Sequence, residues 1–229
     1  QKYPPRRCGQ DARVTRIAPS PTGYLHLGVL FTAMVNRLTA KASGGVFYFR
    51  LEDTDKKREV EGGAEDILEG LKAYGVIPDE GFIAPGVIKG DYAPYRQSER
   101  RDIYRAYAKS LLIAGLAYPC FCDEDTIQSV RERQEQKKLR TGYYGEYAVC
   151  RNLTPEQAIL RIEEGQPYVL RLRCHPESGS RRIIFNDLIK GKIEMPENDE
   201  DFVLLKSDGI PTYHFAHAVD DHLMRTTHV

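Results

Sequence analysis

A histidine and a glycine stand two residues apart near the start of the chain, at His26 and Gly28. They follow a turn-rich segment, residues 19–23, and precede apolar residues with helical spacing. The free amide groups at the start of a helix favour phosphate, and glycine lets another group approach closely. A histidine there can donate a hydrogen bond to a phosphate as charge develops during a displacement. The pair alone fits an ordinary helix cap equally well, so other residues must decide.

Charged residues occur close to the same segment. Arg16 lies within an apolar run over 14–18, Ser20 follows that run, and Glu52 follows a second apolar run over 46–51. Ligands of open α/β sheets bind at the carboxyl ends of parallel strands, so we expect these side chains to meet near His26. A guanidinium group holds a carboxylate, and a carboxylate holds an ammonium group, which together suit a zwitterion.

Structural roles are the alternatives for these charged residues. Arg16 could form a salt bridge with Glu52 itself, and the acidic residues at 53 and 55 could cap the next helix. The sequence around the two runs leaves both alternatives open.

The elements that must position these residues follow from the apolar pattern. Runs over 14–18 and 46–51 predict buried strands, and one face of the helix between them is apolar. A strand, helix and strand in this order predict a parallel pair with a right-handed crossover. Helical periods over 67–74 and 98–114 extend the alternation and predict an α/β fold with a Rossmann-type parallel sheet. The apolar residues of the first helix are Leu27, Leu30, Phe31, Met34, Val35 and Leu38.

The pattern changes after Tyr118, where a charged helix over 125–140 and short alternating strands over 168–174, 181–185 and 190–195 follow. Thr154 and Pro155 predict the start of another helix, which Gly165 ends. We expect an inserted α+β subdomain, with residues 202–205 returning to the main sheet. The predicted organisation is a tail (1–11), the first half of a catalytic domain (12–117), the insertion (118–202) and the start of the second half (203–229).

Several segments together resemble glutamyl-tRNA synthetases, which are class I aminoacyl-tRNA synthetases. Residues 16–23, 26–28 and 50–55 resemble the first signature of that family, and residues 94–100, 204–214 and 219–224 resemble later ones. The resemblance covers about Arg13 to Val229, with its motifs in the family's order. It implies the same fold, with the insertion as the subdomain that binds the tRNA acceptor end.

The resemblance also implies roles by position. Catalysis falls to His26 and Gly28. Glutamate is expected at Arg16, Ala18, Ser20, Glu52, Tyr213 and His217, and ATP at Pro19, Thr22, Gly23, His26 and Gly28. Two positions depart from the pattern: Val29 replaces a histidine of the signature, and His217 stands where a bacterial relative has asparagine.

Five cysteines, an odd number, fit a reducing compartment better than a disulfide scaffold. Cys120, Cys122 and Cys150 are the candidates for a zinc site, which some relatives have, but tetrahedral zinc needs a fourth ligand. Tyr144 and Tyr147 do not match the Tyr-containing version of the site in their spacing from Cys150. We therefore expect no metal.

Basic residues in the insertion could contact phosphates of a tRNA acceptor stem, and a solvated strand face is the alternative. These residues are Arg171, Arg173, Arg181 and Arg182. Lys+Arg and Asp+Glu both total 33, so no overall charge would attract nucleic acid and local clusters must do so.

We therefore expect a glutamate–tRNA ligase that uses ATP with Mg²⁺, L-glutamate and tRNA(Glu). No apolar run is long enough to cross a membrane, and we expect a cytoplasmic monomer. The chain lacks an initial Met and its last pattern stops at Val229, which predicts a fragment, inactive when isolated. The alternatives are a glutamyl-queuosine tRNA(Asp) synthetase-like enzyme, a small-molecule nucleotidyltransferase and a non-catalytic tRNA-binding relative.

Overall fold

The computed structural model describes residues 3–55, 57–174 and 181–229. The chain forms two compact units: residues 1–104 with 213–229, and residues 105–212. The predicted insertion, 118–202, lies within the second unit, which also takes in most of a helix before it and a strand after it. Parts of the predicted tail and insertion, residues 1–2 and 175–180, lie outside the described residues.

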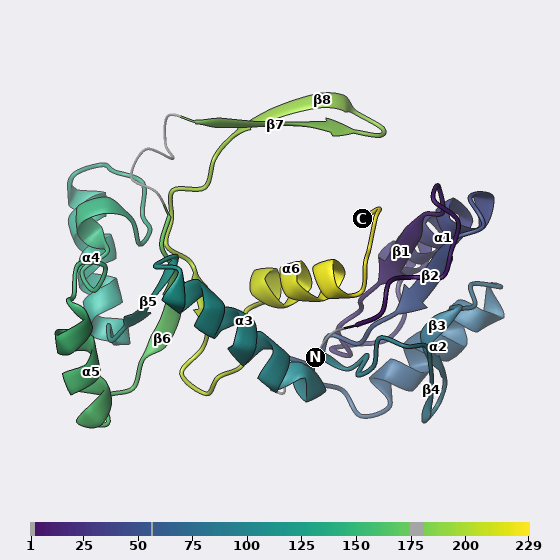
Figure 1. Cartoon of the computed structure of the whole chain (residues 1–229), viewed down its shortest axis with the longest axis horizontal. Helices are drawn as coiled ribbons and strands as arrows, with labels where there is room; N and C mark the ends of the chain where they lie inside the picture. The colour runs from purple at the N-terminus through teal and green to yellow at the C-terminus, as the bar shows by residue number, and fades with distance from the viewer. Residues whose placement is uncertain (1–2, 56, 175–180) are drawn as a thin grey trace. The chain divides into compact units, whose positions relative to one another are not determined.

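The first unit is built on a four-stranded sheet in the order β1, β2, β3, β4 (Figure 1). The strands are β1 (Val14–Ile17), β2 (Val46–Phe49), β3 (Glu80–Ala84) and β4 (Val87–Lys89). The pairs β1–β2 and β2–β3 are parallel, and β4 adds to β3 in the antiparallel direction. The predicted parallel pair is confirmed, whereas the β3–β4 hairpin was not foreseen.

Helices α1 (Leu27–Ala42) and α2 (Gly63–Ala73) join these strands, and α6 (Tyr213–Leu223) completes the first unit. The core contains Phe47 and Phe49 of β2 together with Ile67, Leu68 and Leu71 of α2. A single turn of 3₁₀ helix, Gln97–Arg100, leads into α3 (Arg101–Ile113).

The apolar stripe of α1 is not its buried face. Leu30 is buried, but Leu27 and Phe31 are 80% and 66% exposed. Ala33 and Ala40 are fully buried instead, so the buried face of α1 carries small side chains beside Leu30. The apolar period therefore located the helix correctly and assigned its orientation incorrectly.

The second unit contains a three-stranded antiparallel sheet in the order β5, β6, β9. Its strands are β5 (Ala117–Cys120), β6 (Val169–Leu172) and β9 (Val203–Leu205), with helices α4 (Glu124–Gln136) and α5 (Pro155–Glu163) and a 3₁₀ turn at Gly145–Tyr147. Thr154 caps α5 as predicted, in a capping box with Gln157. The expectation that 202–205 returns to the main sheet is wrong, because β9 pairs with β6. None of the described helices is long and apolar enough to span a membrane.

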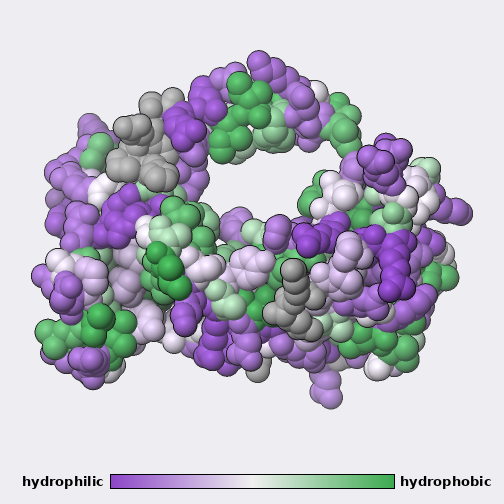
Figure 2. Space-filling view, viewed as in Figure 1, coloured by the Kyte–Doolittle hydropathy of each residue, from purple (hydrophilic) through white to green (hydrophobic). Residues whose placement is uncertain are grey.

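Strands β7 (Arg182–Asp187) and β8 (Gly191–Pro196) form a separate two-stranded hairpin. Ile183, Phe185 and Met195 share one of its faces and are each more than 40% exposed. Figure 2 shows apolar side chains among charged ones on this hairpin. The hairpin thus lacks the layered packing that usually stabilises two strands.

Two glycines of the first unit have a positive φ, but only one of them has other atoms close to where a Cβ would lie. Gly81 in β3 has a φ of +88°, and a Cβ there would lie 1.8 Å from the Phe49 carbonyl oxygen. Gly75, after α2, has a φ of +73° and open space around a Cβ. We expect Gly75→Ala to cost about 1 kcal/mol of unfolding free energy through φ alone.

Gly81→Ala should cost at least about 3 kcal/mol because β3 must move away from β2. Denaturant titration of both variants measures the difference. Equal costs would contradict the close approach of these strands.

Candidate active site

A buried arginine links the end of β2 to α6. Arg50 is fully buried, and its backbone N–H donates to the Ile17 carbonyl at 3.0 Å. Its Nη1 donates to Asp221 Oδ1 at 2.8 Å, and its Nε lies 3.6 Å from Asp220 Oδ2. Removing one partner of a buried ion pair typically costs about 3–5 kcal/mol. Arg50 therefore fixes α6 against the carboxyl end of β2.

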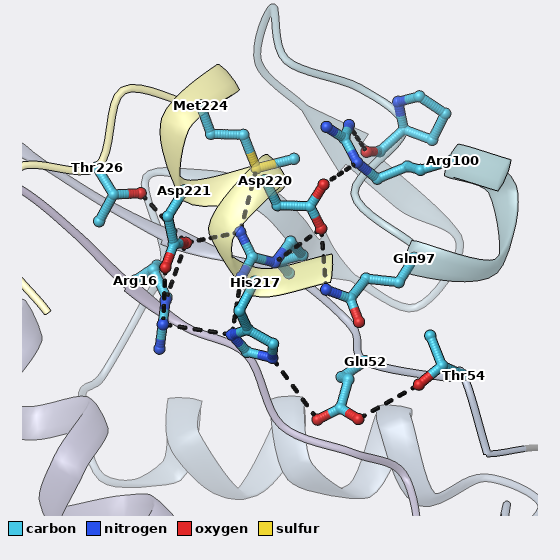
Figure 3. A network of polar contacts seen from close by, with 12 residues as sticks. Arg16, Glu52, Thr54, Gln97, Arg100, His217, Asp220, Asp221, Met224 and Thr226 are labelled. Carbon is cyan, nitrogen blue, oxygen red and sulfur yellow. Dashed lines mark hydrogen bonds and ion pairs between the residues drawn. The ribbon is translucent and has the colours of Figure 1, made fainter. Parts of the chain in front are cut away.

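Asp221 also holds the side chain of Arg16, which comes from β1 (Figure 3). Arg16 Nε donates to Asp221 Oδ1 at 3.2 Å, and Arg16 Nη2 donates to Oδ2 at 2.9 Å. Burial raises the pKa of Asp221, but the Arg16 and Arg50 guanidinium groups outweigh this effect and the pKa lies below its ordinary value. Within the described part of the chain, Arg16 Nη1 makes no hydrogen bond, so that end of the guanidinium can bind a ligand.

His217 lies between the two arginines. Its Nδ1 is 3.3 Å from Arg16 Nη2 and 3.2 Å from Arg50 Nη2. The Tyr213 ring lies over the imidazole, with ring centroids 4.1 Å apart. These contacts place three predicted glutamate-binding residues, Arg16, Tyr213 and His217, in one cluster.

Glu52 completes the cluster from the loop after β2. Its carboxylate accepts a hydrogen bond from Ser20 Oγ at 2.8 Å and lies 3.8 Å from His217 Nε2. Burial raises the pKa of Glu52, but His217 and Ser20 together outweigh burial and the pKa is lowered. The alternative of an Arg16–Glu52 salt bridge is wrong, because Arg16 pairs with Asp221. Glu52 therefore carries an anionic carboxylate that Arg16 does not neutralise.

Asp220, which precedes Asp221 on α6, is held by several further side chains. It is fully buried and accepts hydrogen bonds from Arg100 Nε at 2.7 Å, Gln97 Nε2 at 2.9 Å and Tyr104 Oη at 2.8 Å. Burial, followed by the charge of Asp220, raises the pKa of Tyr104 well above its ordinary value. The adjacent acids on α6 therefore share Arg50 and otherwise differ in their partners, with Arg100, Gln97 and Tyr104 on Asp220 and Arg16 on Asp221.

The predicted phosphate loop runs from the end of β1 to α1. Pro19 O accepts from the Glu52 N–H at 3.0 Å, and Pro21 O accepts from the Val60 N–H at 2.7 Å. His26 is the N-cap residue of α1 and is exposed, and a Cβ on Gly28 would lie 3.2 Å from its ring. His26 and Gly28 thus adjoin each other, as the sequence predicted.

The other loop residues have less definite surroundings. Ala18 is partly buried directly after β1, Gly23 is partly buried, and Thr22 is exposed. Their roles in binding glutamate or ATP stay predictions. Asp53 has a structural role, but it does not cap the next helix, α2, as the alternative had it: it accepts from the Ser98 N–H at 2.8 Å and from Ser98 Oγ at 2.5 Å.

Sequence reasoning gave no role to Arg50, Asp220 or Asp221, although all lie in the motifs that carried the resemblance. One signal could have found them. Arg50 follows the apolar residues 46–49, and an arginine at the end of a buried strand requires a buried acid. The adjacent acids at 220 and 221 are the partners, on α6.

Three cysteines and a tyrosine gather in the second unit. The Sγ atoms of Cys120, Cys122 and Cys150 lie within 4.8 Å of one another. The Tyr143 hydroxyl lies 3.2 Å from both Cys120 Sγ and Cys122 Sγ. Hydrogen bonds from Cys122, then Cys150, lower the pKa of the Cys120 thiol. The sequence analysis weighed Tyr144 and Tyr147 as a fourth donor and overlooked Tyr143.

The predicted RNA-binding arginines already have partners within the protein. Arg171 donates to the Asp201 carbonyl at 2.8 Å and lies over the Tyr143 ring, and Arg173 lies over the Tyr118 ring. On the hairpin, Arg182 Nε bonds to Glu194 at 2.5 Å, and Arg181 lies 3.8 Å from Glu197. Arg181 and Arg182 are the more exposed and remain the better candidates for contact with phosphate.

A parallel sheet with a histidine–glycine loop at a helix start, and charged groups at the strand ends, defines the class of protein. Residues 13–229 match the family described as tRNA synthetases class I (E and Q), catalytic domain, and the chain belongs to that family.

Its relatives share a specificity. The chain is 54% identical to the glutamate–tRNA ligase of Clostridium beijerinckii and 51% identical to that of Clostridium perfringens, in each case over 229 residues and the whole chain. It also resembles the crystal structure of a glutamate tRNA ligase from Elizabethkingia meningosepticum in complex with its amino acid. That match has a TM-score of 0.85 and 43% identity, and covers 96% of this chain and 43% of that one. The chain spans 41% and 42% of the two Clostridium proteins.

The lowered pKa of Asp221 predicts how stability depends on pH. A carboxyl group whose pKa is lower in the folded state stabilises the fold above its unfolded value, about 4. That contribution is lost as pH falls through the folded pKa. We therefore expect Asp221→Asn to be less stable than wild type at pH 7, with the difference shrinking below about pH 4.

Thermal unfolding of both proteins between pH 3 and 7 checks this expectation. Glu52→Gln provides a comparison at a second acid whose pKa is lowered in the folded protein. A stability difference for Asp221→Asn that stays constant across the range would contradict the stabilising ion pairs of Asp221 with Arg16 and Arg50.

Proposed function

We propose that this chain is the glutamate- and ATP-binding part of a glutamate–tRNA ligase. The observation that carries the proposal is the cluster of Arg16, Glu52 and His217 at the strand ends, where donors and an acceptor face one site. A zwitterionic amino acid with an additional carboxylate is the ligand that best suits this arrangement. The Clostridium relatives, which carry that name, support the same substrate.

Each side chain has a definite task in the proposed site. Arg16 offers the two N–H groups of Nη1 to a carboxylate, because Asp221 holds its other edge. Glu52 offers an anion to the substrate ammonium group, and Ser20 steadies that carboxylate through its hydrogen bond. Tyr213 lies against His217 and is half exposed, so it can contact both the ring and a bound substrate.

The reaction requires positioning and charge stabilisation rather than a covalent nucleophile. A glutamate α-carboxylate oxygen attacks the α-phosphorus of ATP, and the bond to the bridging oxygen of pyrophosphate breaks. A ribose hydroxyl at the tRNA 3′ end then attacks the activated carbonyl and releases AMP. His26 and the start of α1 can hold phosphate oxygens during the first step.

The finer parts of the proposal follow from the sequence. We propose that ATP binds as its Mg²⁺ complex, that tRNA(Glu) is the acceptor and that the enzyme is a cytoplasmic monomer. Arg181 and Arg182, on or next to the exposed hairpin, would contact acceptor phosphates more readily than Arg171 and Arg173.

We also propose that Cys120, Cys122, Cys150 and Tyr143 hold a zinc ion, in place of the metal-free interpretation that spacing favoured. Zinc–sulfur bonds of about 2.3 Å place tetrahedral sulfur atoms ~3.8 Å apart. Cys122 and Cys150 already lie 3.6 Å apart, and the Tyr143 oxygen is near enough to be the fourth ligand. The ion would stabilise the second unit and take no part in the reaction.

Amino acid specificity and Arg16 provide the test of the proposed reaction. Pyrophosphate exchange by the full-length protein that carries this chain should require glutamate, not glutamine or aspartate, and added tRNA. Arg16→Ala should lose at least about 100-fold in kcat/KM for glutamate, because a charge-assisted contact to the substrate carboxylate disappears. Arg37→Ala is the control, because Arg37, on α1, also forms an ion pair, with Asp79 at 2.8 Å, but lies outside the proposed site.

Two results would reject this function: exchange that prefers glutamine, or an Arg16→Ala variant as active as Arg37→Ala. Charging of tRNA(Asp) in place of tRNA(Glu) would favour the glutamyl-queuosine alternative.

Metal analysis of the purified protein tests the zinc site. We expect about one zinc per chain, and almost none in Cys150→Ser, because three ligands hold the ion far more weakly than four. Cys174→Ser is the matched control, since Cys174 is buried but lies outside the cluster. If wild-type protein purified without chelator contains no zinc, the proposed zinc site is wrong and the metal-free prediction holds.

A further inference from the structure

The position of the proton on His217 follows from its neighbours. Nδ1 faces the Nη2 groups of Arg16 and Arg50, at 3.3 and 3.2 Å. A guanidinium group has N–H donors and no acceptor, so Nδ1 can only present its lone pair to both arginines. The ring proton must then be on Nε2.

Among the described residues, the Nε2–H group has the Glu52 carboxylate as a charged neighbour but makes no hydrogen bond. Nε2 is buried and makes no hydrogen bond among the described residues. The nearest carboxylate oxygen, Glu52 Oε2, is 3.8 Å away, which is beyond hydrogen-bonding distance. Unsatisfied buried donors are rare in folded proteins, and each one calls for an explanation. The side chain is about nine-tenths buried, so the donor is held in a fixed direction.

Asp221 determines where both guanidinium groups lie. Its Oδ1 accepts from Arg16 Nε and Arg50 Nη1, and its Oδ2 accepts from Arg16 Nη2. Both arginines therefore present Nη2 to the imidazole at the same time. Tyr48 Oη, 2.7 Å from Thr226 Oγ1, closes the opposite side of the carboxylate at 3.4 Å.

We infer that Asp221 is a positioning residue that orients Arg16 and Arg50 so that His217 is fixed as the Nε2–H tautomer, a donor to a substrate carboxylate. The inference rests on the proposed function for the identity of the ligand, but not for the tautomer. Three hydrogen bonds tie the Asp221 carboxylate to the two arginines, so we assign it a role through them.

The arrangement explains which substitutions the site should tolerate. Asparagine at 217 has an amide oxygen that can accept from the arginines and an N–H that can donate to the ligand, so it reproduces the polarity of the tautomer. Leucine has neither group. Asp221→Asn replaces one acceptor by an N–H donor that faces a guanidinium, and should release both arginines.

Nitrogen NMR of histidine-labelled protein tests the tautomer without any enzymatic activity. The signal of His217, identified among six histidines by its loss in His217→Asn, should show Nε2 protonated and Nδ1 unprotonated. In Asp221→Asn we expect a mixture of the two tautomers. A wild-type ring protonated on Nδ1 would overturn the inference, and this reading stands even if glutamate is not the substrate.

Kinetics of the full-length protein test the positioning role. Asp221→Asn should raise the KM for glutamate about tenfold or more, with a smaller change in kcat. Glu80→Gln is the matched control: Glu80 forms a similar ion pair with Arg6 at 2.9 Å, with 20% of its side chain exposed against 18% for Asp221. It should lower thermal stability without raising the KM.

His217→Asn should keep the KM within about threefold of wild type, whereas His217→Leu should raise it about tenfold or more. These two variants test the donor even if Asp221→Asn does not fold. Equal KM values for asparagine and leucine at 217, or an Asp221→Asn variant that behaves like Glu80→Gln, would overturn the inference. Absence of any glutamate-dependent exchange by wild type would instead reject the proposed function.

Discussion

The first unit depends on the neutralisation of Arg50. A guanidinium group at the end of a buried strand can be tolerated only with acids close to it, and α6 supplies two in succession. One of them, Asp221, lies at hydrogen-bonding distance, and the other, Asp220, lies 3.6 Å away and is anchored by Arg100. The need to pair one buried cation thus decides where a distant helix docks and which of its faces meets the strands.

The same pairing leaves certain groups unused, and these make the site. Asp221 and His217 occupy Nε and Nη2 of Arg16 and leave Nη1 available. The two arginines in turn occupy Nδ1 of His217 and leave Nε2 facing Glu52. Structural bonds therefore select the groups that remain available to a ligand. The polarity of the site, with donors on one side and an anion on the other, is a consequence of the core rather than an addition to it.

Periodicity and end signals were enough to predict the parallel strands, the helix after the loop and the cap at Thr154, because these depend on local patterns. The side of α1 that is buried depends on tertiary packing, and the structure buries Ala33 and Ala40 where the apolar pattern predicted larger side chains. The partner of β9 could not be read from 203–205, since any apolar strand of three residues fits either sheet. The convergence of Arg16, Ser20 and Glu52 followed from the parallel topology, but their partner Asp221 is distant in sequence and was not foreseen. Tyr143 was missed because spacing from Cys150 was counted along the chain, whereas a metal site is defined in space.

The contacts of α6 with β1 and β2 join residues 205 and 171 positions apart in the chain. Such long separations form late, after local strands and helices, because a long loop must close first. On the ribosome, where domains fold as they emerge, β1 and β2 are exposed well before their counter-ions are made. Until then Arg50 must stay hydrated, so the end of β2 cannot become buried. Arg16 and Arg50 therefore gain Asp221 as a partner only after α6 has been translated, and a nascent chain that stops short of α6 carries the histidine–glycine motif without these ion pairs.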